Sequence, residues 1–293
     1  MDRKSFIKKA LISGSVGALA PTLLATEIKQ RTTDTTKIVS QEGFNHIPNK
    51  EIRTMKTVLH RANTRGHADH GWLKANHSFS FANYYNPERM NFGVLRVLND
   101  DQIAPGKGFG THPHENMEII TIPLSGQVEH KDSMGNSGVI SPGEVQVMSA
   151  GTGIQHSEYN KNKDQELKLL QIWLIPNKTK VTPRYDQLAF TNLATENGFK
   201  QILSPNANDA GVWIHQNAWF HLGELKANET YTYRLKDATN GVYAFLIEGE
   251  VILENETLNP RDGMGIWDST EIKIKASTGS KILLMEVPLQ NKN

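Results

Sequence analysis

The sequence predicts an all-β protein made of two similar β-barrels in tandem, and three observations lead to this prediction. Short apolar runs of strand length, such as FGVLRVLND and LKLLQIWLIP, follow one another from Val58 onward. Turn-forming clusters such as LSGQ, SMGNSG and SPGE separate these runs, a pattern typical of sandwiches and barrels. The segments TIPLSGQVEHKD and FLIEGEVILEN each contain a strand, a glycine turn and a second strand in the same order, which indicates a weak internal repeat.

The strand pattern defines two barrels and the segments around them. Residues 57–176 carry the first series of strands, without a convincing helical period, and form the first predicted barrel. The pattern loosens over residues 177–211, which we interpret as a connector, and resumes over residues 212–293, the second predicted barrel. Residues 31–56 are polar, so they are expected to form a linker or an extended arm.

Residues 1–30 resemble an export signal rather than part of the fold. A basic start, MDRKSFIKK, precedes an uncharged stretch from Ala10 to Thr26 that is only moderately apolar and short for a membrane-spanning helix. The motif DRKSFIK resembles the twin-arginine export signature, with Lys4 in place of the second arginine. We therefore expect a periplasmic or secreted protein with no stable membrane span after processing. If the leader is not a signal, the alternative is a cytoplasmic protein.

The composition excludes several classes of site and partner. The chain contains 32 Lys and Arg residues and 31 Asp and Glu residues, a net charge of +1, which argues against a strongly charged nucleic-acid partner. It contains no cysteine, so disulfides, thiolate metal sites and cysteine nucleophiles are excluded. We expect a monomer that acts on a small molecule and binds no nucleic acid.

Two short motifs place candidate metal ligands at same-face spacing. In a strand, residues two apart point to the same side, so His112 and His114 project together, and so do His156 and Glu158. Pro113, between the first two, suits the start or the edge of a sheet. Three imidazoles and one carboxylate suit a divalent transition metal with open positions for small ligands. The alternative is that these four side chains lie on solvent-facing strands.

The remaining polar clusters are interpreted as structural. His130, in EHKDSMGN, is predicted to be an exposed histidine of a hairpin. The segment RGHADHGW is expected to fasten the N-terminal part of the chain to the barrel by hydrogen bonds rather than to bind a second metal, through His67, Asp69 and His70. In the second repeat, His215 and His221 are expected to be structural or surface residues. In the first repeat, Glu115 is expected to be exposed.

Several of these motifs together resemble one family. GTHPHENMEIITIPLSG resembles the first cupin motif, and GTGIQHSEYN resembles the second. With RGHADHGWLKANHSFSFANYYNPERMNFGVLRVLNDD and EHKDSMGN added, the chain is similar to the pirin family over about residues 55–290. The resemblance implies a tandem cupin, or bicupin, with the metal in the N-terminal barrel and a degenerate C-terminal barrel.

The resemblance also implies a ligand set and a cofactor. The pirin ligands correspond to His112, His114, His156 and Glu158. Glu118, the glutamate of the general first cupin motif, is expected to support these ligands or to face the substrate. The expected cofactor is one divalent transition metal, Fe(II) first, although Mn, Co, Ni and Cu accept the same ligands.

The function implied by the resemblance is quercetin 2,3-dioxygenase activity, in which O2 cleaves the flavonol ring and carbon monoxide is released. Glu158 is the expected catalytic residue and would accept the proton of the enolic substrate. Some pirins are instead non-enzymatic, iron-binding transcription co-regulators whose redox state changes partner affinity. The export-like leader and the near-neutral charge argue against that role. A cupin of another activity, such as an isomerase or a metal-storage protein, is a third alternative.

Overall fold

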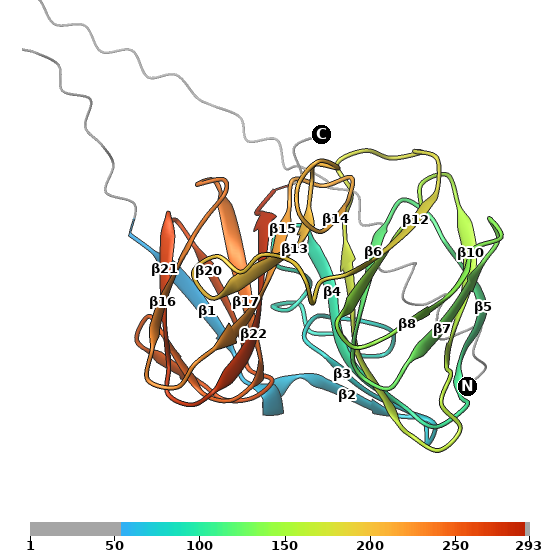
Figure 1. Cartoon of the computed structure of the whole chain (residues 1–293), viewed down its shortest axis with the longest axis horizontal. Helices are drawn as coiled ribbons and strands as arrows, with labels where there is room; N and C mark the ends of the chain where they lie inside the picture. The colour runs from blue at the N-terminus through green and yellow to red at the C-terminus, as the bar shows by residue number, and fades with distance from the viewer. Residues whose placement is uncertain (1–53, 291–293) are drawn as a thin grey trace, which may run out of the picture.

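The structure is a computed structural model, and it describes residues 54–290. These residues form four antiparallel or mixed β-sheets, arranged as four layers in two barrels that lie side by side (Figure 1). The one helical element in this part of the chain is a single 3-10 turn, η1 (Ala62–Thr64). The predicted all-β tandem-barrel fold is therefore confirmed.

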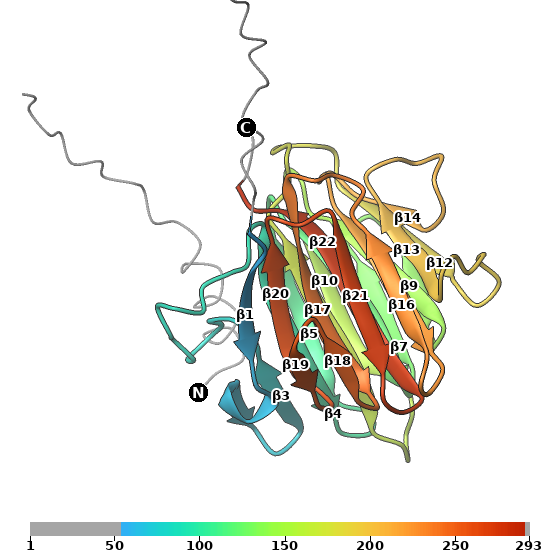
Figure 2. The ribbon, with the colours of Figure 1, turned by 90° about the vertical axis from the view of Figure 1, so that its left-hand side faces the viewer.

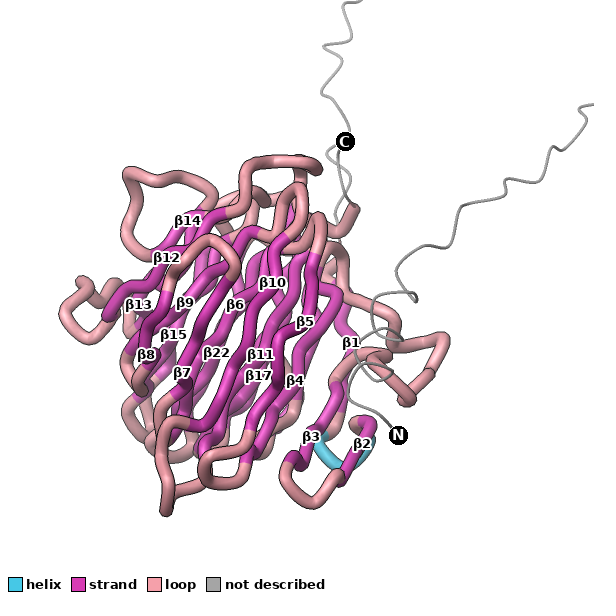
Figure 3. Tube along the Cα trace, turned by 90° about the vertical axis from the view of Figure 1, so that its right-hand side faces the viewer, coloured by secondary structure: helices cyan, strands magenta, loops and turns pink. Residues whose placement is uncertain are grey.

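The first barrel consists of a seven-stranded sheet and a four-stranded sheet. The larger sheet has the order β12-β9-β6-β11-β4-β3-β2 and the smaller sheet the order β5-β10-β7-β8. In Figure 3 the smaller sheet faces the viewer. The strands of this barrel are β2 (Gly66–Asp69), β3 (Leu73–His77), β4 (Leu95–Ile103), β5 (Gly108–His114), β6 (Glu118–Ser125), β7 (Val128–Asp132), β8 (Ser137–Ile140), β9 (Glu144–Ser149), β10 (Ile154–Asn160), β11 (Leu167–Leu174) and β12 (Arg184–Ala189).

The second barrel repeats this arrangement. Its seven-stranded sheet has the order β1-β20-β17-β22-β15-β13-β14, and its four-stranded sheet, in front in Figure 2, has the order β16-β21-β18-β19. The strands are β1 (Lys56–His60), β13 (Phe199–Ser204), β14 (Val212–Trp213), β15 (Trp219–Leu225), β16 (Thr230–Arg234), β17 (Asn240–Glu248), β18 (Val251–Leu253), β19 (Glu256–Leu258), β20 (Gly263–Trp267), β21 (Glu271–Ala276) and β22 (Ser280–Pro288).

The two seven-stranded sheets pack against each other, and this contact holds the barrels together. One apolar cluster joins side chains of both sheets, including Ile120 and Val147 from the first barrel and Phe220 and Phe245 from the second. Each fully buried side chain of this size contributes roughly 1.5–3 kcal/mol. The central strands of each large sheet are buried on both faces, one against the other barrel and one inside their own, so β6, β11, β17 and β22 are largely apolar on both sides.

The strand pairing differs from the predicted domain limits at two places. β1 lies at the start of the predicted first barrel, yet it pairs with β20 at the edge of the second barrel (Figure 1). The predicted connector, residues 177–211, contains two strands: β12 pairs with β9 in the first barrel and β13 pairs with β15 in the second. The sequence RYDQLA of β12 is half exposed and polar, so its pattern does not identify it as a strand.

The predicted leader, residues 1–30, and residues 31–53 of the predicted arm lie outside the residues that the structure describes. Within the described range, no helix is long and apolar enough to cross a membrane.

Candidate metal centre

Two adjacent strands, β5 and β10, present the histidines predicted as ligands. In their antiparallel register His156 lies opposite His112, and Ile154 lies opposite His114. β5 is the edge strand of its sheet, so the missing N–H group of Pro113 is tolerated there. The predicted spacing therefore brings the two motifs together on neighbouring strands.

The turn AGTG brings β10 into this position. Gly151 has a φ angle of +48° and Gly153 a φ angle of +128°, a region that L-residues with a side chain rarely adopt. A Cβ atom at position 151 would also collide with the backbone carbonyl of Val181. The turn therefore requires glycine, which explains why a Gly-rich segment precedes His156.

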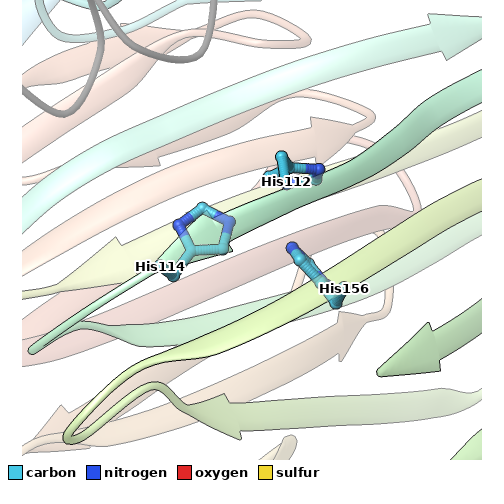
Figure 4. A group of neighbouring side chains, drawn as sticks. All are labelled: His112, His114 and His156. Carbon is cyan, nitrogen blue, oxygen red and sulfur yellow. The ribbon is translucent and has the colours of Figure 1, made fainter. Parts of the chain in front are cut away.

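The three imidazoles form a compact triangle (Figure 4). The ring centroids are 4.9 Å apart for His112 and His114, 4.4 Å for His112 and His156, and 4.8 Å for His114 and His156. One ligand nitrogen from each ring lies within 4.8 Å of the others. This spacing suits three imidazoles that bind one ion. In metal sites an imidazole nitrogen typically lies about 2.0–2.1 Å from an ion such as zinc, so two such nitrogens lie within about 4 Å of each other.

Burial keeps these rings in the neutral form that binds metals. Desolvation lowers the pKa of His112, lowers that of His114 to about 3, and lowers that of His156 well below its usual value. Both ring nitrogens of His156 and the Nδ1 atom of His114 are buried without a hydrogen-bond partner among residues 54–290. Buried polar atoms are normally paired, so these nitrogens fit a site that a metal completes.

A backbone contact fixes the tautomer of His112. Its Nδ1 atom lies 2.8 Å from the carbonyl oxygen of Gly110. Because a carbonyl only accepts, Nδ1 carries the proton and Nε2 keeps the free lone pair. This is the arrangement in which a backbone carbonyl orients a metal-binding histidine.

Glu158 lies two residues after His156, beyond an irregularity in the β5–β10 register. Its carboxylate is held from the large sheet: Thr121 donates to Oε1 at 3.1 Å and Gln171 donates to Oε2 at 2.8 Å. Ligand atoms of Glu158, His156 and His130 lie within 4.8 Å of one another. The structure thus gives two overlapping groups of potential ligands, which share His156.

A pocket opens beside these residues, inside the first barrel. His112, His114 and Glu158 form part of its wall. Much of the rest is apolar or aromatic, and Trp173 packs edge-on against His114 with ring centroids 5.0 Å apart. The other lining residues are Leu73, Ala75, His77, Phe81, Asn99, Asp101, Phe109 and Gln171. Apolar walls with a few polar groups are typical of a small-molecule site.

Comparison with known proteins places the chain in a family. The family model described as pirin matches residues 54–174, and the model described as quercetinase C-terminal cupin domain matches residues 201–287. The protein belongs to the pirin family. A curated quercetin 2,3-dioxygenase of Escherichia coli (strain K12) is 45% identical to this pirin over 230 residues, which cover 78% of this chain and 98% of the relative.

Other relatives agree with this assignment. A pirin-like protein of Caulobacter vibrioides is 43% identical over 222 residues, 75% of this chain and 95% of that protein. The crystal structure of the bacterial pirin YhhW from Escherichia coli in complex with nickel(II) has a TM-score of 0.75 and 44% identity, and the match covers 80% of this chain and 99% of that one. The bicupin fold of this pirin is thus shared with a relative that binds a metal.

His130 does not occupy the exposed hairpin position that the sequence predicted. Its side chain is completely buried on β7, directly opposite Glu158 on β10. Its ring lies 4.7 Å from that of Tyr185 and 5.3 Å from that of His156, and its Nε2 atom lies 3.5 Å from Asp132 Oδ2. The spacing of His130 and Asp132, two apart in a strand, was the available signal for an inward-facing pair.

Glu118 points away from this centre, so the prediction that it supports the ligands or faces the substrate is wrong. Ile119 packs inside the first barrel, whereas Glu118 lies on the same face as Ile120, toward the second barrel. Ser149 donates a 2.7 Å hydrogen bond to Glu118. The backbone of His215 also hydrogen-bonds this carboxyl group. Burial raises the pKa of Glu118 to about 7. The first cupin motif spans β5 and β6, which belong to different sheets, so the alternation of faces along β5 does not determine which way Glu118 points.

The other histidines are placed largely as the sequence predicted. The His67 ring bonds Asn76 across β2 and β3, which fastens this N-terminal segment to the sheet. His221 is buried and lies 3.2 Å from the Tyr233 hydroxyl, which donates to Glu286, so it is a structural residue of the second barrel. Glu115 is exposed.

Proposed function

We propose that this pirin is a metal-dependent dioxygenase that cleaves flavonols such as quercetin with O2. The observation that carries the proposal is the largely buried triangle of His112, His114 and His156, with unpaired ring nitrogens on His114 and His156. It lies beside a largely apolar pocket whose wall includes His112, His114 and Glu158. Relatives at 45% identity that carry the name quercetin 2,3-dioxygenase support the reaction.

We propose that the ligands are the three histidines of this triangle and the carboxylate of Glu158. Neutral imidazoles and a carboxylate are suitable donors for Fe(II), which we propose as the resident ion; Mn, Co, Ni and Cu fit the same donors. The nickel complex of the related pirin YhhW supports a divalent transition metal. When bound, such an ion supplies Lewis acidity and redox chemistry for the reaction of the substrate with O2.

The protein side chains would prepare the substrate for this chemistry. A flavonol carries an acidic enolic hydroxyl, and we propose that Glu158 accepts its proton. The hydrogen bonds from Thr121 and Gln171 keep the Glu158 carboxylate at a fixed position. The aromatic residues Phe81, Phe109 and Trp173 would cover the planar rings of the substrate and exclude water from the reacting bonds.

The proposal is tested with purified protein of known metal content. Metal analysis should give one transition-metal ion per chain, and quercetin absorbance should fall in air, with release of carbon monoxide, but not under argon. Protein in which His112 and His114 are both replaced by alanine is the control. It should neither bind the metal nor consume quercetin in air. Stoichiometric metal without oxygen-dependent loss of flavonol would contradict the proposal and favour a metal-dependent binding protein.

We also propose that residues 1–30 direct export, which would place the protein in the periplasm or outside the cell. The basic start and the uncharged stretch up to Thr26 support this proposal. Fractionation of expressing cells and N-terminal sequencing test it: the exported protein should begin after the leader. Full-length protein that remains in the cytoplasm would contradict it.

A further inference from the structure

Two neighbouring aspartates on β4 face opposite sides of the large sheet. Asp100 faces the second barrel, where its Oδ2 atom accepts from Arg65 at 3.1 Å and lies 3.6 Å from Arg261 Nε. Asp101 faces the interior of the first barrel and lines the pocket of the candidate metal centre. The first acid is thus paired with cations, and the second lies in a predominantly apolar environment.

Asp101 is buried without a partner for one of its oxygens. Its side chain is 4% exposed, and its Oδ1 atom has no hydrogen-bond partner in the part of the chain that the structure describes. Its cross-strand neighbours are Ala75 on β3 and Leu169 on β11, which have no side-chain polar group. An unpaired buried oxygen costs folding free energy, so its retention needs a reason.

The other amide and carboxylate oxygens of the pocket wall have partners, whereas two ring nitrogens, His114 Nδ1 and Trp173 Nε1, are also buried without one among the described residues. His77 bonds Asn99 at 2.8 Å, and Gln171 donates to Glu158. These residues share one row across the large sheet, because Asn99 lies opposite both His77 and Gln171. Asp101 lies one row further along the large sheet and has an unpaired buried oxygen. The large sheet faces the small sheet, which carries the three histidines.

We propose that Asp101 is a substrate-orienting residue, which hydrogen-bonds a ring hydroxyl of the polyphenol and so aligns the flavonol between the large sheet and the histidine triangle. The inference rests on the proposed function, because it takes the pocket to be the flavonol site. A phenolic hydroxyl of the substrate would supply the hydrogen-bond partner that the protein does not provide for Asp101. A flavonol that has only the enolic hydroxyl would leave Asp101 without this partner.

The chemistry of the site is consistent with this role. Desolvation, with the nearby charges of Asp100 and Glu158, raises the pKa of Asp101 well above its usual value. A neutral carboxyl group both donates and accepts a hydrogen bond, as a phenolic hydroxyl does. The two groups are therefore complementary in an apolar pocket, and no counter-charge is required.

The first test measures stability, which does not depend on turnover. Asp101→Leu removes an unpaired carboxyl from an apolar environment, so its melting temperature should equal or exceed that of the wild type in metal-free protein. Asp100→Asn, the matched control, weakens the contacts with Arg65 and Arg261 and should lower the melting temperature. Destabilisation by Asp101→Leu to the same extent as by Asp100→Asn would show a structural role and overturn the proposal.

The second test measures binding under argon to nickel-loaded protein, with quercetin and 3-hydroxyflavone as probes. 3-Hydroxyflavone keeps the enolic hydroxyl but lacks the other ring hydroxyls. Asp101→Leu should weaken quercetin binding about tenfold, the loss expected for one buried hydrogen bond, and leave 3-hydroxyflavone binding unchanged. Asp101→Asn, which keeps a polar group of the same shape, should bind quercetin within about threefold of the wild type.

The outcomes separate this inference from the proposed function. Equal losses for both probes, or no loss for either, would overturn the role of Asp101 while oxygen-dependent turnover by the wild type still supports the function. Selective loss of quercetin binding without any turnover in air would support the role of Asp101 and contradict the dioxygenase. Wild-type protein that binds neither probe would contradict both.

Discussion

Gln171 on β11 donates a 2.8 Å hydrogen bond to Glu158 on β10, and this bond connects the two sheets of the first barrel across its interior. The donor comes from the large sheet, whereas the acceptor lies in the small sheet beside the histidines. The proposed ligand geometry therefore depends on a residue outside the ligand motifs, on the next strand along the chain.

Replacement of Gln171 by leucine should reduce activity and metal affinity by about 10–100-fold, the usual effect of removing a group that orients a ligand. The volume is similar, so the fold should persist. Metal titration and steady-state kinetics measure the effect. Gln201→Ala is the matched control, because Gln201 donates to the Ala210 carbonyl in the second barrel and should leave both quantities unchanged. Wild-type kinetics in the Gln171 variant would show that the bond does not position Glu158.

Glu158→Gln should retain most of the bound metal and lower kcat by about 10²–10⁴-fold, the range for loss of a general base. The amide keeps an oxygen that can bind the ion but does not accept a proton. Metal analysis and a flavonol assay on the same preparation distinguish the two roles. Rapid flavonol loss in the metal-loaded variant would exclude Glu158 as the proton acceptor.

His130→Phe should keep one metal ion per chain, because the proposed ligands are the triangle and Glu158. Phenylalanine preserves the ring contact with Tyr185, 4.7 Å away. His114→Ala should lose the metal, which metal analysis of both variants detects. Equal loss of metal in the two variants would assign His130 to the ligand set, since its ligand atom lies within 4.8 Å of those of His156 and Glu158.

Glu118→Gln should change how stability depends on pH. Burial raises the pKa of Glu118 from 4.5 to about 7, so the folded state retains a proton that the unfolded state loses. The contribution of Glu118 to stability is therefore complete below pH 4.5 and falls as pH rises toward 7, by an amount on the order of 3 kcal/mol. Glutamine does not titrate and still accepts from Ser149.

Denaturant unfolding of wild type and Glu118→Gln at pH 5 and pH 8 measures this difference. The variant should gain stability relative to the wild type between the two pH values. A stability difference that is constant with pH would show that Glu118 has the same pKa in both states.

The local pattern predicted the fold class and most of the candidate site. Alternating strand positions place His112 with His114, and His156 with Glu158, wherever the strands lie. The Gly-rich turn before His156 and the proline between the first two histidines depend only on backbone conformation, so these features were also available from the sequence.

The failures have one cause, which is that burial on a given face depends on neighbours that are distant in sequence. His130 was predicted to be exposed, but β7 lies between β10 and β8 and is covered by the large sheet. Glu118 belongs to the same motif as His112, but β6 lies in the other sheet, so the alternation of faces on β5 does not extend to Glu118. The pairing of β1 with β20 likewise has no local signal.

The sequence by itself determined the tandem barrels, the glycine turns and which side chains within a motif share a face, because these follow from the periodicity of single strands. Only the tertiary structure decided which face enters the pocket. β4 buries both of its faces, so its sequence does not distinguish Asp100 from Asp101. Packing of the second barrel on one side pairs Asp100 with arginines and leaves Asp101 inside, facing the candidate metal centre.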